Sequence, residues 1–213
     1  MKHVTTKKID RAFCTTREAG EMLGVSIGTA QLWVENGLLH AWKTPGGHRR
    51  VTRDSIERLL HSRLSDAPSS APAPLNSDVR RLKVLVVEDD AKLARAYETT
   101  LSQWPMAPDV SLANNGIDAL LMIERLGPDL LVIDLGIAGI DGFKMLQVLR
   151  GNSRYAGMSM VVVSELDVAE IVYRGHLPPG VFLLPKPVPF ERLLEIATQV
   201  EVRRRAAAGQ SAP

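Results

Sequence analysis

The chain lacks two features that would associate it with the cell exterior or with a membrane. It has one cysteine among 213 residues, Cys14, so no disulfide can form within it. We interpret Cys14 as a small buried apolar side chain in a reducing cytosol. No stretch approaches the roughly 18 consecutive apolar residues of a membrane span, and residues 1–13 contain no apolar segment typical of a secretion signal. These absences predict a cytoplasmic protein that does not bind membranes.

Charge divides the chain into two parts. Residues 1–64 contain 11 Lys/Arg and 6 Asp/Glu, a net charge of +5, whereas residues 65–213 contain 15 and 18, a net charge of −3, which together give +2. A small basic domain and a larger acidic one indicate that only the first meets an anionic partner. Residues 65–81 are rich in Pro, Ala and Ser without apolar periodicity, which predicts a linker with a reach on the order of 25 Å.

Four short apolar runs in the second part each end in polar residues. The runs are LVV before Glu88 and Asp89, LLVI before Asp134, MVVV before Ser164, and VFLL shortly before Lys186. Short apolar runs are typical of strands buried on both faces, and the carboxyl ends of parallel strands meet at the edge where α/β sheets bind ligands. We therefore expect carboxylates, a hydroxyl and an ammonium group to converge at one edge.

The acidic groups of this edge predict a metal ion. Two like charges 4 Å apart repel by roughly 4 kcal/mol at an effective dielectric constant near 20, so Glu88, Asp89 and Asp134 need a counter-charge to share a site. Mg²⁺ prefers one or two carboxylates together with water and phosphate oxygens. We expect Mg²⁺ as the cofactor.

The strings VLVVEDD, VIDLGIAGIDG, VVVSE and LLPKPV resemble the receiver domain of two-component response regulators, over residues 82–206. The resemblance implies a doubly wound α/β fold with a parallel, flavodoxin-like five-stranded sheet. It implies that Asp134 accepts a phosphoryl group from a histidine kinase or phosphotransfer protein, and that Lys186 and Ser164 contact the phosphoryl oxygens. Such a domain catalyses only its own phosphoryl transfer and dephosphorylation, so we do not expect another enzymatic activity.

The same resemblance implies a set of metal ligands, and the chain differs from the family pattern at two places. It implies that Glu88, Asp89, the Asp134 carboxylate and the backbone carbonyl of Gly136 bind Mg²⁺. The family usually has Met-Pro where this chain has Ile-Ala at 137–138. It also places an aromatic residue three positions before the lysine, where this chain has Leu183 with Phe182 one step earlier.

The first part predicts a helix-turn-helix with a wing. Thr15 and Glu18 form a capping box for one helix, Ser26 caps a second, and Thr52 caps a third. Between the last two, residues 38–43 and 48–51 predict a hairpin with Pro-Gly-Gly at its tip. A helix, tight turn and helix place the second helix in the DNA major groove.

The segment from TTREAGEMLG to KTPGGHRR resembles the winged helix-turn-helix of MerR-type and excisionase-type DNA-binding domains, which we assign to residues 11–64. The resemblance implies a mostly α domain with a β-hairpin wing that binds double-stranded DNA. The residues it implies for the major groove are Ser26, Thr29 and Gln31, and those for phosphates or the minor groove are Lys43, His48, Arg49 and Arg50. Trp33 and Trp42 are interpreted as core residues, because a small domain needs large apolar side chains.

The hypothesis from the sequence is a response regulator in which phosphorylation controls DNA binding, and hence transcription, through self-association of the receiver. The expected partners are double-stranded DNA, a histidine kinase or phosphotransfer protein, and a second copy of the chain. Two alternatives remain. One is a phosphorelay or scaffold protein whose first domain binds protein, and the other is an excisionase-like architectural factor that bends DNA. We expect residues 207–213 to form a disordered tail.

Overall fold

The structure is a computed structural model that describes residues 12–44, 46–65 and 80–209. The chain divides into two compact units, one within residues 1–71 and the other within residues 72–213. Most of the predicted linker, 66–79, lies outside the described residues, as do residue 11 and the last part of the predicted tail, 210–213. None of the described helices has the length and apolar character needed to cross a bilayer.

The first unit contains three helices whose starts follow the sequence. Helix α1 (Thr16–Leu23) begins after the predicted capping box, in which Thr15 Oγ1 accepts from the Glu18 N–H and the Glu18 carboxylate accepts from the Thr15 N–H. Helix α2 (Ile27–Glu35) begins after Ser26, whose hydroxyl accepts from the Thr29 N–H at 2.9 Å. Helix α3 (Arg53–Ser65) begins after Thr52. These caps satisfy N–H groups that the helices leave unbonded.

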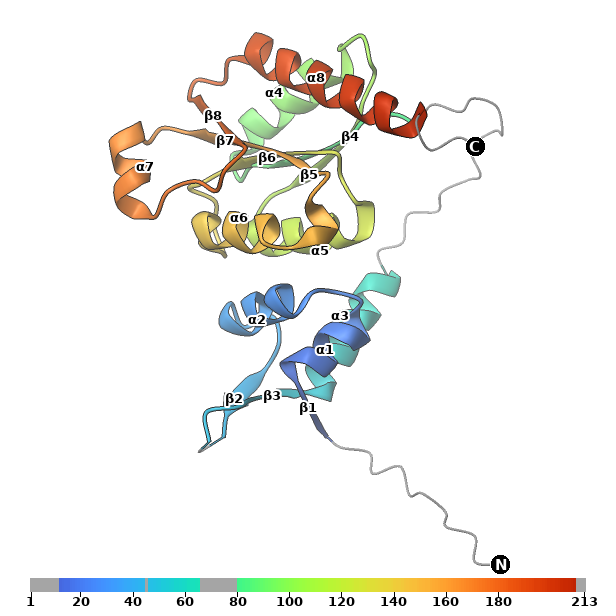
Figure 1. The fold of residues 1–213 in the computed structure, drawn as a ribbon, viewed down its shortest axis with the longest axis vertical. Coiled ribbons are helices and arrows are strands. Elements are labelled where there is room, and N and C mark those ends of the chain that lie inside the picture. The colour runs from blue at the N-terminus through green and yellow to red at the C-terminus, as the bar shows by residue number, and fades with distance from the viewer. Residues whose placement is uncertain (1–11, 45, 66–79, 210–213) are drawn as a thin grey trace, which may run out of the picture. The chain divides into compact units, whose positions relative to one another are not determined.

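A small antiparallel sheet completes this unit. Strands β2 (Ala41–Lys43) and β3 (Arg49–Thr52) form the predicted hairpin, and β1 (Phe13–Thr15) pairs with the other edge of β3. Strand β1 was not predicted, since three residues are too few to show an alternating pattern. The unit is mostly helical with a β-hairpin wing, as predicted (Figure 1).

The second unit is a five-stranded parallel sheet in the order β5-β4-β6-β7-β8. The strands are β4 (Lys83–Val87), β5 (Asp109–Ala113), β6 (Leu130–Asp134), β7 (Ser159–Ser164) and β8 (Val181–Pro185). This is the flavodoxin-like order, in which the chain reverses direction across the sheet between β4 and β6. The predicted doubly wound fold is confirmed.

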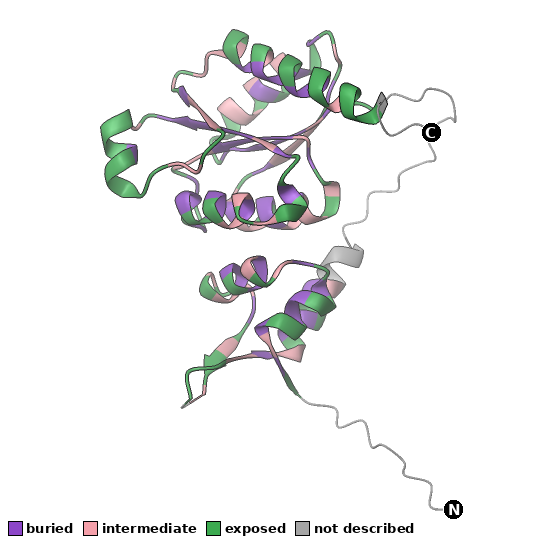
Figure 2. Cartoon of the chain, viewed as in Figure 1, coloured by how far each residue is buried: buried purple, intermediate pink, exposed green. Residues whose placement is uncertain are grey.

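Helices cover both faces of this sheet. Figure 1 shows α4 (Ala91–Ser102) and α8 (Phe190–Gly209) on one face, and α5 (Gly116–Leu126) and α6 (Gly142–Arg150) on the other. Tyr97 and Leu101 of α4 pack with Leu193 and Ile196 of α8 over the strands. The strand interiors are buried, as Figure 2 shows in purple. The apolar runs of the sequence are therefore strands buried from both sides.

Two details of this unit differ from the sequence prediction. A short helix η1 (Ser153–Tyr155) and helix α7 (Val168–Arg174) were not predicted, although Asp167 and Glu170 form a capping box that marks the start of α7. Helix α8 continues to Gly209, so residues 207–209 are helical and do not belong to a disordered tail. The run of alanines at 206–208 favours this continuation, because alanine has the highest helix propensity.

Candidate functional site

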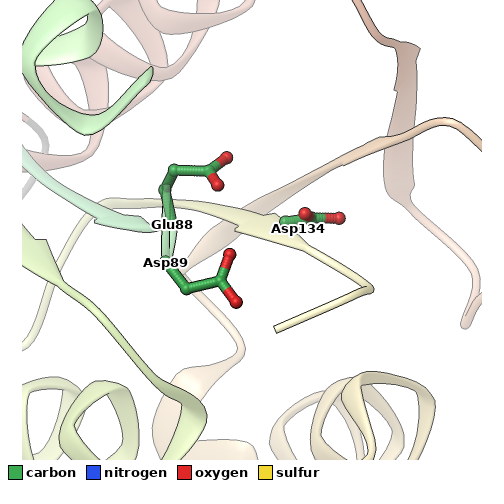
Figure 3. A group of neighbouring side chains, drawn as sticks. All are labelled: Glu88, Asp89 and Asp134. Carbon is green, nitrogen blue, oxygen red and sulfur yellow. The ribbon is translucent and has the colours of Figure 1, made fainter. Parts of the chain in front are cut away.

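The sheet topology brings the acidic residues of two strands together. Strand β4 lies beside β6, with Val87 paired to Ile133, so Glu88 and Asp89 follow β4 where Asp134 ends β6. This is the point at which the strand order reverses, and α/β sheets bind ligands in the crevice there. Carboxylate oxygens of the three residues lie within 4.8 Å of one another. Figure 3 shows Glu88 and Asp89 reaching from one strand end toward the same region as Asp134.

Lys186 lies between two of these carboxylates. Its Nζ is 2.8 Å from Asp134 Oδ2 and 3.3 Å from Glu88 Oε2. The lysine follows β8, and its backbone N–H donates to the Ser164 carbonyl at 3.0 Å, which fixes the loop against β7. The ammonium group therefore supplies one positive charge to a cluster that carries three carboxylates.

Backbone N–H groups orient the carboxylates further. Gly136 N–H donates to Asp134 Oδ1 at 3.0 Å, which leaves Oδ2 facing Lys186. Asp90 N–H donates to Glu88 Oε1 at 3.1 Å. Each of the two carboxylates is thus held by a turn of the chain next to it. The proposed use of the Gly136 carbonyl as a metal ligand stays a prediction.

The surroundings of Glu88 and Lys186 shift the pKa of each side chain. Burial raises the pKa of Glu88, and the nearby Asp134 charge adds to this, while the Asp90 N–H and Lys186 partly oppose it. Burial acts to lower the pKa of Lys186, but its hydrogen bond to Asp134 and the charges of Asp134 and Glu88 outweigh burial and raise it. Lys186 is consequently held in its charged form, which is the form that can bind a phosphoryl oxygen.

Ser164 ends β7 beside this cluster. Asp134 pairs with Val163 in the sheet, so Ser164 lies one residue further toward the same edge. The serine is buried, and its Oγ accepts a hydrogen bond from the Leu166 N–H at 3.0 Å. Its predicted contact with a phosphoryl oxygen stays a prediction.

The donor set fits a Mg²⁺ ion. Mg²⁺ takes one or two carboxylates and keeps several waters, and here Glu88 is buried, Asp134 is half-buried and Asp89 is exposed. Glu88, Asp89 and Asp134 can hold the ion, and the exposure of Asp89 leaves one side open to water or phosphate.

Two residues near the cluster were not assigned by the sequence. The carboxylate of Asp90 caps α4 by accepting from the Lys92 and Leu93 N–H groups, so this side chain serves the helix, while the Asp90 backbone N–H holds Glu88. Tyr97 of α4 is buried, and its pKa is raised by burial and by the charges of Glu88 and Asp134. No signal in the sequence places Tyr97 near the acids, because their proximity depends on how α4 packs on the sheet.

In the first unit, the structure separates the three residues predicted to read the major groove. Gln31 is exposed, but Thr29 is 1% exposed, and its hydroxyl lies 2.8 Å from that of Ser26. The two hydroxyls serve the start of α2. The prediction that the Thr29 side chain contacts DNA is wrong for this conformation, because that side chain is buried. The sequence did not show this, because a hydroxyl at the start of a helix can either cap the helix or face a ligand.

The basic residues of the wing have different surroundings. Lys43 and His48 are exposed, and Arg50 is half-buried in the middle strand β3. Arg49 makes an ion pair of 3.1 Å with Glu35 at the end of α2. This contact links the wing to α2.

The two tryptophans of this unit also differ. Trp33 is 0% exposed and belongs to the core, as predicted. Trp42 is 41% exposed, so its predicted core position is wrong. It packs edge-on against Phe13 of β1, with ring centroids 4.3 Å apart, on the outer face of the small sheet. The pairing with an unpredicted strand explains how an aromatic residue outside the core is accommodated.

Comparison with known proteins supports both units. Residues 84–198 match the response regulator receiver domain, and residues 13–64 match a helix-turn-helix domain. A protein-glutamate methylesterase/protein-glutamine glutaminase 5 of Myxococcus xanthus is 33% identical over 133 residues, covering 62% of this chain and 38% of the relative. The DNA-binding response regulator MtrA of Mycobacterium bovis is 32% identical over 96 residues, covering 45% of this chain and 40% of the relative.

A solved structure also resembles the second unit. The receiver domain of the Francisella response regulator 1452 is 29% identical, with a TM-score of 0.50, and the match covers 58% of this chain and 98% of that one. The chain spans about two fifths of the length of the methylesterase and of MtrA. Taken with the sheet order and the acidic cluster, the matches show that the chain belongs to the response regulator receiver family and carries an N-terminal helix-turn-helix domain.

Proposed function

We propose that the protein is a response regulator whose binding to double-stranded DNA is controlled by phosphorylation of Asp134. The phosphoryl donor is a histidine kinase or a histidine phosphotransfer protein. The observation that carries the proposal is the contact of Lys186 with Asp134 at 2.8 Å beside two further carboxylates. This arrangement supplies a nucleophile, a fixed cation and a metal site within one small region.

The chain's own residues have separate roles in the transfer. A carboxylate oxygen of Asp134 bonds to phosphorus as the bond from phosphorus to the donor's imidazole nitrogen breaks, and the imidazole takes up a proton. The Gly136 N–H and Lys186 orient the Asp134 carboxylate beforehand. Lys186 and Ser164 then donate hydrogen bonds to oxygens of the transferred group. Mg²⁺, when bound by Glu88, Asp89 and Asp134, neutralises negative charge on the phosphoryl oxygens.

The output is DNA binding by the first unit. We assign the major groove to α2, with Gln31 exposed on it, and phosphate contacts to Lys43, His48, Arg49 and Arg50 of the wing. Receiver self-association would raise the effective concentration of paired DNA-binding units.

A phosphorylation assay tests the first half of this proposal. The full chain is incubated with Mg²⁺ and acetyl phosphate, a small phosphodonor, and the acyl phosphate is located by mass spectrometry. We expect phosphate on wild type and on Asp90→Asn, because Asp90 caps α4 and asparagine caps equally well. We expect none on Asp134→Asn.

The outcomes separate the candidates. Phosphate on Asp134→Asn at the wild-type level would contradict Asp134 as the acceptor. Phosphate on Asp134 that passes to a histidine phosphotransfer protein, in a chain with no DNA affinity, would favour the phosphorelay function instead.

A further inference from the structure

The exposed surface of α2 is small and has a definite chemistry. Ile27 and Gln31 are four residues apart and both exposed, so they lie on one face, a turn apart. Ile27 is 39% exposed, so α2 presents an aliphatic side chain beside the amide of Gln31 on this face. The first turn of α2 contains no acidic residue and its last turn no basic residue.

The neighbouring residues on α2 are committed elsewhere. Thr29, Leu32 and Trp33 are buried in the unit, and Ser26 caps the helix. Glu35, one turn beyond Gln31, makes the ion pair with Arg49 of the wing. Among the described residues of α2, Ile27 and Gln31 are therefore the side chains with the exposure to reach base edges in its first two turns.

The chemistry of these two side chains selects a base pair. A glutamine amide can bond N6 and N7 of adenine at once, whereas guanine in the major groove is typically read by arginine or lysine, which α2 lacks on this face. An aliphatic side chain favours the C5-methyl group of thymine. Placing the isoleucine against the polar edge of a base would cost binding free energy, because the donors and acceptors of that edge would lose their hydrogen-bond partners.

We propose that α2 reads A·T base pairs, with Gln31 on an adenine and Ile27 on the methyl group of a thymine. The inference rests on the proposed DNA-binding function and adds the bases to it. Four helical residues advance about 6 Å, and stacked bases are about 3.4 Å apart, so the two bases lie within about two base pairs of each other. The specificity is set by these two side chains and not by the basic wing.

The test first selects binding sites for the full chain from a random duplex library. We expect an adenine and a thymine within about two base pairs in each half-site. The thymine is then replaced by deoxyuridine, which removes only the methyl group. We expect this replacement to weaken wild-type binding about fivefold to tenfold, and to leave Ile27→Ala binding unchanged.

Two variants complete the design. Met22→Ala removes an apolar side chain of similar exposure, 37%, from α1, and we expect it to keep the wild-type response to deoxyuridine. For Gln31→Ala, we expect the ratio of affinities for sites with adenine and with guanine at this position to fall about tenfold or more. Because Ile27 and Gln31 are both exposed, we expect each variant to fold. The helical content measured by circular dichroism checks this.

The possible failures are distinguishable. Selected sites without the adenine and thymine, or an equal deoxyuridine penalty in wild type and Ile27→Ala, would overturn the base assignment while DNA binding itself stands. Absence of sequence-selective binding in every phosphorylation state would overturn the proposed DNA-binding function and the base assignment together.

Discussion

The two sites of this chain are held in opposite ways. In the receiver, Glu88 and Asp134 are bonded to Lys186 and to backbone N–H groups at the ends of buried strands. On the DNA-binding unit, Gln31 and the wing residues Lys43 and His48 project from the surface. A site built from interlocked, partly buried groups depends on the whole sheet. A site built from exposed side chains can change its target without disturbing the fold beneath it.

The largest expected effect comes from comparing a buried and an exposed tryptophan of the DNA-binding unit. We expect Trp33→Ala to lower the free energy of unfolding of this unit by about 3–5 kcal/mol, because it leaves a large cavity in the core. Trp42→Ala removes an exposed edge-on pair with Phe13 and should cost about 1 kcal/mol. Urea denaturation followed by circular dichroism measures both. Equal losses would break the distinction between core and surface aromatic residues.

The next effect tests the interlocked site. Glu88→Gln removes one of three neighbouring negative charges, and we expect the Mg²⁺ affinity, measured by calorimetry, to fall at least about tenfold. Glu98→Gln makes the same chemical change at an exposed position of α4 and should leave the affinity unchanged. Unaltered Mg²⁺ binding by Glu88→Gln would remove this carboxylate from the metal site.

A smaller effect tests the wing, at the half-buried Arg50 of β3. Arg50→Ala should weaken DNA binding to all sequences alike and reduce the slope of log affinity against log salt by about 1, as expected for loss of one phosphate contact. Arg58 of α3 pairs with Asp54 and is exposed, so Arg58→Ala serves as the matched control. A slope that changes equally in both variants would mean that the wing has no special part in phosphate binding.

The smallest effect concerns pH. Burial acts to raise the pKa of Glu201, but hydrogen bonds from Arg205 and Arg204 outweigh it and lower the pKa. A lowered pKa in the folded state gives stability that is present above the unfolded value of about 4.3 and is lost as pH falls through the folded value. Glu201→Gln should therefore be less stable than wild type near pH 7, by on the order of 1 kcal/mol or less, with the difference shrinking below about pH 4. A constant difference from pH 7 to pH 3 would contradict this.

The sequence predicted the receiver site better than the DNA-binding surface, for a physical reason. Parallel strands deliver their carboxyl ends to one edge, so Glu88 and Asp134 meet at the ends of neighbouring strands, and Lys186 reaches them with its side chain from the end of β8. On α2, exposure depends on how the helix is rotated against its core. That rotation buried Thr29 and exposed Ile27, although both lie at the helix start.

Long-range pairings account for the other differences. Strand β1 could not be predicted because three residues carry too little pattern, so the pairing of Trp42 with Phe13 of that strand could not be predicted either. The ion pair of Glu35 with Arg49 joins residues 14 positions apart and has no local signal. The starts of α1 and α2 were predicted correctly, because a capping residue acts within one turn of the helix.

The central claim is that a phosphoryl group on Asp134 changes how the first unit binds DNA. The most direct measurement is a DNA titration of wild type and Asp134→Asn, each with Mg²⁺ and with or without the phosphoryl mimic beryllofluoride, with the oligomeric state recorded alongside. We predict that the mimic alters affinity or oligomeric state in wild type only. The same response in both proteins, or no response in either, would contradict the claim.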